Sequence, residues 1–148
     1  MLKFLFPHYQ FSRIMQISRQ WLEQQEMSVI LLDLDRTLLS CKNEKSLYAF
    51  SDWLDRKQEQ GFRFYLLCDC SSGGIFGRSH LKRLADDLNL PRLTLFSKKL
   101  SFCYRKLLRK EHLDRNDTVL ISDRSACCGN IPAAKIAGIR CIRVKPPR

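Results

Sequence analysis

The chain has 148 residues and a mass of 17.4 kDa, the size of one domain with a single substantial core. Its 45% hydrophobic and 28% charged residues are ordinary for a globular protein and argue against intrinsic disorder. No run approaches the about 20 apolar residues that span a bilayer, and no signal-peptide pattern opens the chain. We therefore expect a cytoplasmic protein that is soluble or lies peripherally at the inner face of a membrane.

The charge is the unusual property, because 26 Lys and Arg against 15 Asp and Glu leave a net charge of +11. Such an excess favours anionic partners, namely nucleic acid, anionic lipid or phosphorylated substrates. A solubilising basic surface explains it equally well, so charge alone does not name the partner. The seven cysteines are an odd number, and without a secretory signal they indicate reduced thiols in a cytosol-like compartment.

The first 27 residues are expected to form a helical segment that packs on the domain formed by residues 28–145. Residues 7–26 carry apolar side chains at helical spacing and predict an amphipathic helix. The spaced residues are Ile14, Ile17, Trp21 and Leu22. Because no acidic residue precedes Glu23, organellar targeting or contact with a membrane surface stays open as well.

Strands and helices then alternate along the chain. Apolar runs predict strands at residues 29–34, 62–67, 92–96, 118–121 and 139–144. Amphipathic stretches predict helices at residues 44–60, 76–88 and 101–112, and a short helix opened by Asn130 and Pro132. Asn43 and Ser101 are the expected N-caps, and Gly61 and Gly138 the expected stops. This order predicts an α/β, Rossmann-like fold: a parallel five-stranded sheet with helices on both faces. Residues 35–43 leave no room for a cap domain.

The first strand runs directly into two carboxylates, Asp33 and Asp35, followed by Thr37. At the carboxyl end of a buried parallel strand they would lie in the crevice where open α/β sheets bind ligands. Buried acids are costly unless a metal, a proton or hydrogen bonds satisfy them. These acids are therefore the first candidates for a functional site.

Two further strand ends are expected to converge on the same crevice, bringing the loop at Cys68 and the loop at Asp123. The pair Lys98-Lys99 could reach it too. This set suits phosphoryl transfer: one carboxylate attacks phosphorus and a second acts as general acid and base. Mg²⁺ and a lysine would neutralise the charge of the phosphate.

The stretch Asp33-Leu34-Asp35-Arg36-Thr37-Leu38 resembles the DxDxT motif of the haloacid dehalogenase (HAD) superfamily. The whole chain is similar to the YqeG-type branch of HAD class III phosphatases. The similarity includes residues 1–7, 99–106 and 121–123, the Gly129-Asn130 step and Ala137-Gly138. YqeG-type proteins are similar to phosphatidylglycerophosphate phosphatases, so the resemblance implies a phosphomonoester or phospholipid-headgroup substrate. It also implies contact with an anionic membrane rather than with nucleic acid.

The resemblance implies a role for each matching residue. Asp33 would be the nucleophile and Asp35 the general acid/base, with Mg²⁺ held by Asp33, Asp123 and the backbone carbonyl of Asp35. The implied phosphate-binding residues are Thr37, Cys68, Asp69 and Lys99.

Several positions depart from the family pattern. Arg36 replaces the usual asparagine, Cys68-Asp69-Cys70 replace a serine and asparagines, and Leu100 replaces a proline. The family's second downstream acid falls on Cys128, and Asn130 offers only a neutral oxygen. Because carboxylates supply most of the affinity for Mg²⁺, a catalytically weakened or inactive HAD-fold binding protein is the main alternative.

Two other classes of protein are weighed against the phosphatase. The first is a soft-metal or redox protein, because four cysteines lie on two loops expected to converge, although not at the usual zinc spacing. These are Cys68, Cys70, Cys127 and Cys128. The second is a nucleic-acid-binding protein, which the charge and the basic residues 104–110 permit, although no recognisable reader motif accompanies them.

Overall fold

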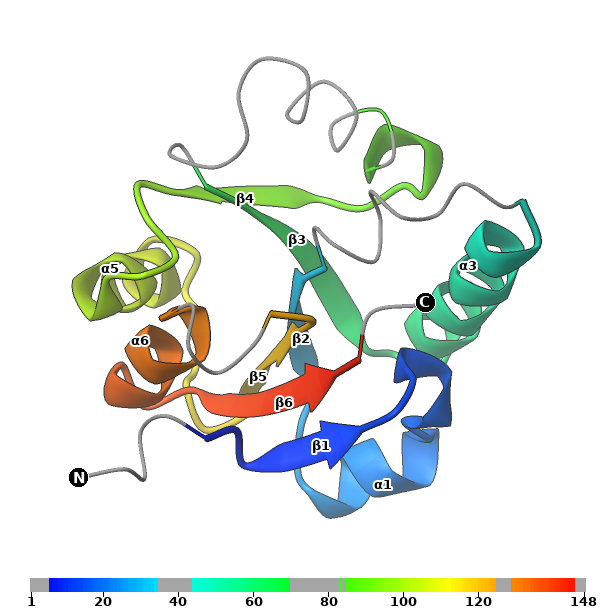
Figure 1. Cartoon of the computed structure of the whole chain (residues 1–148), viewed down its shortest axis with the longest axis horizontal. Helices are drawn as coiled ribbons and strands as arrows, with labels where there is room; N and C mark the ends of the chain where they lie inside the picture. The colour runs from blue at the N-terminus through cyan, green and yellow to red at the C-terminus, as the bar shows by residue number, and fades with distance from the viewer. Residues whose placement is uncertain (1–5, 35–43, 70–82, 84, 125–128, 146–148) are drawn as a thin grey trace.

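A parallel six-stranded sheet forms the centre of the molecule, in the computed structural model that describes residues 6–34, 44–69, 83, 85–124 and 129–145 (Figure 1). The strand order is β1-β6-β5-β2-β3-β4, and every neighbouring pair is parallel. The strands are β1 (Tyr9–Phe11), β2 (Val29–Asp33), β3 (Arg63–Asp69), β4 (Arg92–Leu95), β5 (Thr118–Ser122) and β6 (Arg140–Val144). The expected α/β class is confirmed, but the sheet has six strands, not five.

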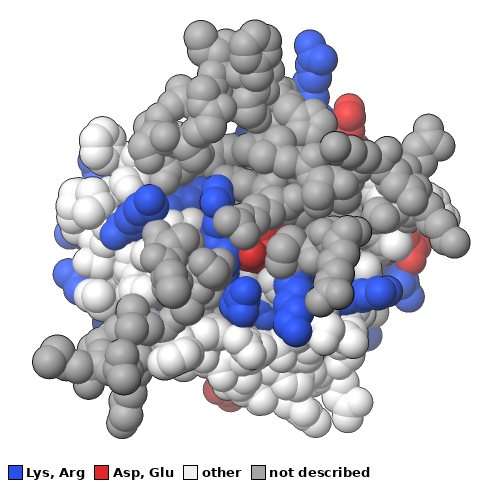
Figure 2. Space-filling view, in the orientation of Figure 1, with Lys and Arg blue, Asp and Glu red and all other residues white. Residues whose placement is uncertain are grey.

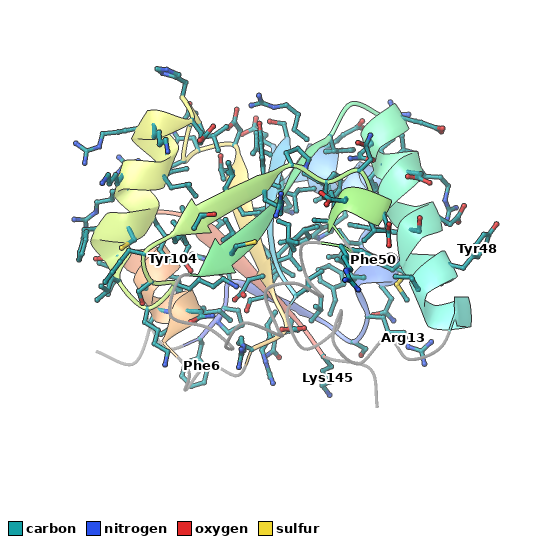
Figure 3. The ribbon with its side chains drawn as sticks, turned by 90° about the horizontal axis from the view of Figure 1, so that it is seen from above. Phe6, Arg13, Tyr48, Phe50, Tyr104 and Lys145 are labelled. Atoms are coloured by element: carbon teal, nitrogen blue, oxygen red, sulfur yellow. The ribbon has the colours of Figure 1, made fainter. Side chains whose placement is uncertain are left out.

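Helices cover both faces of the sheet because alternate residues of each strand point to opposite sides. On β2, Ile30 and Leu32 join one apolar core, and Val29 and Leu31 join the other. The first core lies under the 3₁₀ helix η2 (Ile14–Gln16), α1 (Arg19–Gln24) and α3 (Glu44–Glu59). The second lies under α5 (Ser101–Lys110) and α6 (Asn130–Ile136). Figure 3 shows Phe50 and Tyr104 on opposite sides of the sheet.

The predicted single helix over residues 7–26 is wrong, and the extra strand lies within it. Tyr9 and Phe11 of β1 pair with Ile142 and Val144 of β6, extending the sheet at its edge. A new helix, α1, begins after Ser18, whose hydroxyl accepts a hydrogen bond from the Trp21 backbone N–H at 3.1 Å. The apolar spacing arises because η2, the residue that follows it and α1 all face the same core.

The other predicted elements agree with the structure within a few residues at each end. The exception is the helix predicted at residues 76–88, of which the structure describes only helical residues 83 and 85–87. Asn43 lies outside the described residues, and α5 is capped by Leu100 instead of Ser101. Gly61 and Gly138 follow α3 and α6 with φ of +97° and +89°, a conformation that favours glycine.

The order of the strands reverses at β2, and this positions the candidate site. The chain continues from β2 to β3 and β4 on one side, and then returns to β5 and β6 on the other. The carboxyl ends of β2 and β5 therefore form the topological switch point, the place where open α/β sheets bind ligands. None of the helices within the described residues has the length and apolar character needed to cross a membrane.

The edge strand should be sensitive to pH through His8, whose Nδ1 accepts a hydrogen bond from the Cys141 backbone N–H at 3.0 Å. Burial lowers the pKa of His8 below 6.5, and the charges of Lys135 and Arg140 lower it further. The unfolded chain then binds the proton first, so stability is lost as the pH falls below 6.5 toward the folded-state pKa. We expect the wild-type Tm to fall more than that of His8→Asn between about pH 7.5 and about pH 5.5.

The matched control for this measurement is His112→Asn, at an exposed histidine beyond α5. Its Tm should depend on pH as the wild type's does. Equal pH dependence in the wild type and His8→Asn would show that the His8 contact does not contribute.

Candidate functional site

Asp33 lies at the switch point, as the last residue of β2. It is paired in register with Ser122, the last residue of β5. One residue further on, the backbone N–H of Asp123 donates to the Asp33 carbonyl oxygen at 3.1 Å. The Asp33 and Asp123 side chains are almost fully buried, with exposed fractions of 0% and 1%. The sheet thus brings two acids from distant parts of the chain to one point, as the sequence predicted.

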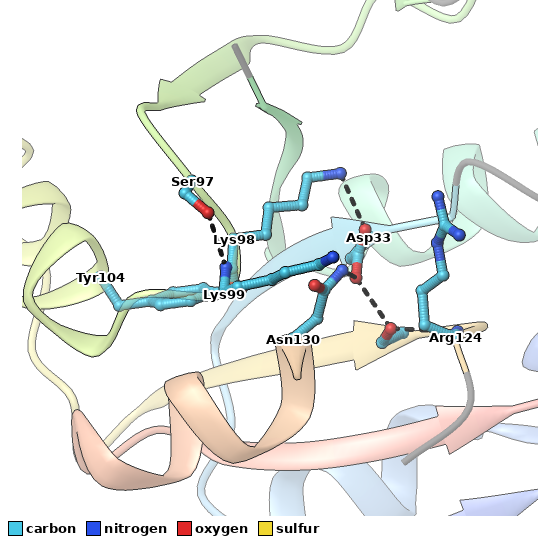
Figure 4. A network of polar contacts seen from close by, with 8 residues as sticks. Asp33, Ser97, Lys98, Lys99, Tyr104, Arg124 and Asn130 are labelled. Carbon is cyan, nitrogen blue, oxygen red and sulfur yellow. Dashed lines mark hydrogen bonds and ion pairs between the residues drawn. The ribbon is translucent and has the colours of Figure 1, made fainter. Parts of the chain in front are cut away.

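Three donors from three different segments hold the Asp33 carboxylate (Figure 4). The Lys98 ammonium donates to Oδ1 at 2.8 Å. The Ser122 hydroxyl and the Asn130 amide both donate to Oδ2, at 2.8 and 2.9 Å. A carboxylate has about four lone-pair positions, so among the described residues Oδ1 keeps one that is unused. The side chain is therefore fixed in orientation, and Oδ1 has a lone pair that no described residue uses.

The surroundings of Asp33 keep it ionised. Burial alone would raise the pKa of this carboxyl, but the Lys98 charge and the hydrogen bonds from Lys98, Asn130 and Ser122 outweigh burial and lower the pKa below 3.8. The stability that this ionised group contributes is therefore present above pH 3.8 and is lost as the pH falls through the folded-state pKa. At neutral pH the site presents a carboxylate, which is the form that acts as a nucleophile or metal ligand.

The neighbouring lysines have different environments. Lys98 has an exposed fraction of only 2%, and its backbone carbonyl accepts a hydrogen bond from the buried Tyr104 hydroxyl at 2.9 Å. Lys99 is exposed, and its aliphatic stem lies along Gly129. Figure 4 shows the end of the Lys99 side chain directed toward Asn130 and Asp33. Lys98 therefore binds the carboxylate, while Lys99 is placed to meet a group that enters from solvent.

Asn130 is the first residue of α6, and the N-cap is Gly129, with a φ of +90°. The expected helix start is confirmed, but the Asn130 side chain serves the site. Its amide N–H bonds to Asp33, which leaves the amide oxygen as the neutral oxygen that the sequence suggested. Cys128, where the resemblance to the HAD superfamily implies a second downstream acid, lies outside the described residues.

Basic side chains surround the site. Figure 2 shows Lys and Arg gathered around a small acidic spot at the centre of one face. The Arg124 backbone N–H donates to the Ser122 hydroxyl at 3.2 Å, and the Arg143 guanidinium donates to the Arg124 carbonyl at 3.2 Å. A buried acid with cations around it favours an anionic ligand.

The other predicted site residues are described only in part. Asp35 and Thr37 lie outside the described residues, as do the cysteines of the second loop. For Asp69 the structure gives the backbone, as the last residue of β3. Cys68 is half-buried and packs against the core under α3. Ser122 was missed as a site residue because a hydroxyl at the end of an apolar strand carries no distinctive pattern, although its place beside Asp123 could have indicated it.

The described residues do not form a complete metal site by themselves. Among them, no three His, Cys, Asp or Glu side chains converge. The thiols of Cys103 and Cys141 are buried in the core, and burial raises the pKa of Cys141 to about 12, which makes it a poor metal ligand at neutral pH. Asp33 and Asp123 nevertheless fit Mg²⁺, which is usually bound through one or two carboxylates together with substrate phosphate oxygens.

Comparison with known proteins gives no relative, since no family model, no curated protein and no solved structure matches the chain. The site must therefore be interpreted from its own geometry.

Replacing Asp33 should reveal how strongly the fold depends on its pairing with Lys98. In Asp33→Asn the buried Lys98 ammonium loses its countercharge, which we expect to lower the free energy of unfolding by about 3–5 kcal/mol. Replacing the lysine as well, in Asp33→Asn/Lys98→Met, removes the uncompensated charge and should recover part of that loss. Urea unfolding of the three proteins measures both effects. A double variant no more stable than Asp33→Asn would contradict the pairing.

Proposed function

We propose that the protein is a Mg²⁺-dependent phosphomonoester hydrolase of the HAD type, acting through an aspartyl-phosphate formed on Asp33. The observation that carries the proposal is the buried Asp33 carboxylate at the switch point, which three donors hold and whose Oδ1 has a lone pair that no described residue uses. The resemblance of residues 33–38 to the DxDxT motif supports the same reaction.

The chemistry follows from the positions of the donors. Oδ1 of Asp33 attacks phosphorus while the bond from phosphorus to the leaving oxygen breaks, and Asp35 protonates that oxygen. Asp35 then removes a proton from water, and the water oxygen attacks phosphorus while the bond from phosphorus to Asp33 Oδ1 breaks, which releases phosphate and restores the Asp33 carboxylate. Ser122 and Asn130 hold Oδ2 throughout, so that Oδ1 faces the substrate. Lys99 donates to the phosphate oxygens as their charge redistributes.

Mg²⁺ would be held by the Asp33 and Asp123 carboxylates and by the backbone carbonyl of Asp35. When bound, it would neutralise phosphate charge and orient the substrate. Thr37, Cys68 and Asp69 are the further phosphate-binding residues in this proposal. The substrate is a phosphorylated small molecule or a phospholipid headgroup such as phosphatidylglycerophosphate. Without a cap domain, the site would be open enough to accept either.

Binding without turnover is a second candidate function, and one observation favours it. The side chain that α6 contributes to the site is the neutral amide of Asn130, so one carboxylate fewer is available to a metal. A weakly bound metal would leave a basic pocket that holds a phosphorylated ligand and turns it over slowly or not at all.

Phosphate release decides between the two. We expect Mg²⁺-dependent release from phosphatidylglycerophosphate and from an aryl phosphate, and none from Asp33→Asn. Because Asp33→Asn is also expected to be less stable, the intermediate is trapped separately on the wild type. Borohydride reduction of the aspartyl-phosphate and peptide mass mapping should locate the modification at Asp33. A wild type that releases no phosphate and gives no trapped adduct would favour binding without turnover.

Lys99 provides a test that does not disturb the core, because its side chain is exposed. Loss of a charged hydrogen bond to the phosphate should lower kcat/KM for a soluble aryl phosphate by roughly 10- to 100-fold in Lys99→Gln, with an unchanged Tm. The matched control is Arg63→Gln, which removes an exposed charge at the opposite end of the sheet. The two variants would have equal activity if Lys99 did not contact substrate.

A further inference from the structure

A second surface, next to the site, combines exposed apolar and cationic side chains. Phe96, Leu100 and Phe102 lie within seven consecutive positions and have exposed fractions of 73%, 38% and 58%. Single exposed apolar residues are common, whereas three large ones within one turn and the start of the helix that follows it favour an interaction surface. We call these three residues the apolar rim.

The turn that carries the apolar rim is fixed by hydrogen bonds. The Ser97 hydroxyl accepts from the Lys99 backbone N–H at 3.2 Å, and the Ser97 carbonyl from the Leu100 backbone N–H at 3.4 Å. The Tyr104 hydroxyl, from inside the second core, donates to the Lys98 carbonyl at 2.9 Å. Because these hydrogen bonds fix the backbone of the turn, the Phe96 and Leu100 side chains are held in their exposed positions.

The outer face of α5 continues this surface with positive charge. Its exposed positions recur with helical spacing and include four cations, which we call the cationic stripe. The exposed residues are Phe102, Arg105, Lys106, Arg109 and Lys110. The opposite face of α5 is buried in the second core. Figure 1 shows α5 on the outside of the molecule, beside α6.

Nothing acidic on the same stretch of chain balances this charge. The sequence has no Asp or Glu between Asp87 and Glu111. Within the part of the chain that the structure describes, the ion pairs involve other cations, so none joins the stripe to a carboxylate. The stripe is therefore complementary to an anionic partner.

We propose that the apolar rim and the cationic stripe dock the protein on an anionic lipid bilayer. Phe and Leu side chains insert at the boundary between headgroups and acyl chains, while Lys and Arg contact anionic headgroups. A nucleic acid would use the cations and could stack on the phenylalanines, but it has no comparable use for Leu100. The combination therefore favours lipid.

Because the apolar rim lies close to the candidate site, docking on a bilayer would also affect access to that site. Lys99 lies between Phe96 and Leu100 in sequence, and its stem contacts Gly129 at the start of α6. A bilayer under the apolar rim would thus lie next to the entrance of the site, so that a phosphate ester carried by a lipid could reach it. Only this consequence rests on the proposed function; the docking itself does not.

Vesicle co-sedimentation of the full chain tests the proposal without metal or turnover, so its failure would leave the hydrolase proposal unaffected. We expect binding to phosphatidylcholine vesicles that contain phosphatidylglycerol, weakening with added salt, and little binding to phosphatidylcholine alone. Lys106→Gln/Arg109→Gln/Lys110→Gln should weaken binding by at least roughly tenfold. Arg13→Gln/Arg63→Gln/Lys145→Gln, which removes the same charge from exposed sites elsewhere, should bind as the wild type does.

The apolar rim is tested in the same way. Phe96→Ser/Leu100→Ser/Phe102→Ser should weaken binding, whereas Met15→Ser/Tyr48→Ser, at exposed apolar positions outside α5, should not. In Phe102→Trp, quenching by lipids brominated in their acyl chains should exceed that of the wild type, which reports insertion.

Three outcomes would overturn the proposal. The first is absence of binding to anionic vesicles at physiological salt. The second is equal loss in the stripe variant and its charge control, which would mean that only net charge matters. The third is stronger binding to a duplex oligonucleotide than to vesicles at equal phosphate concentration, unchanged when the apolar rim is removed.

Discussion

The buried ion pair between Asp33 and Lys98 is the constraint on which the site depends. Its side chains have exposed fractions of 0% and 2%, and the Nζ–Oδ1 distance is 2.8 Å. A pair this deep cannot be exchanged for water, so each partner fixes the other, and Ser122 and Asn130 must satisfy the second oxygen. A well-packed apolar pair would serve stability equally well. The charges therefore agree with the chemistry that we propose for Asp33.

The fold delivers these partners from four distant segments to one point. Asp33 and Ser122 end adjacent parallel strands, Asn130 begins α6, and Lys98 lies in the turn between β4 and α5. Because every strand is parallel, all of these segments reach the carboxyl edge of the sheet, and the reversal of strand order at β2 makes this edge the topological switch point. This topology thereby joins Asp33 and Lys98, which are separated by 65 positions in the sequence.

The sequence predicted the parts of this arrangement that follow from local pattern. Continuous apolar runs indicated β2 and β5, and the two acids at their ends could be expected to meet. Strand β1 was missed because Tyr9 and Phe11 occupy a three-residue edge strand, too short for alternation to be visible, next to residues with helical spacing.

The local sequence pattern also could not predict that Lys98 binds the buried carboxylate while Lys99 stays exposed. Their sequence neighbours hardly differ, and the resemblance to the HAD family assigned the phosphate-binding role to Lys99. Which of two adjacent side chains points inward is decided by the turn after β4, and the Tyr104 hydroxyl holds that turn through the Lys98 carbonyl. Such a contact is tertiary and leaves no periodic signal in the sequence.

The cations in and around the site fall into three groups that differ in their exposure to solvent. Lys98 is buried and neutralised by Asp33, Lys99 lies at the entrance beside Gly129, and the cations of α5 face solvent. Screening by salt weakens exposed charges most and buried pairs least. Long-range attraction of an anionic partner should therefore depend strongly on ionic strength, whereas the orientation of Asp33 should not. In our proposal the same excess of basic residues attracts the partner from outside and fixes the carboxylate within, because burial separates the two effects.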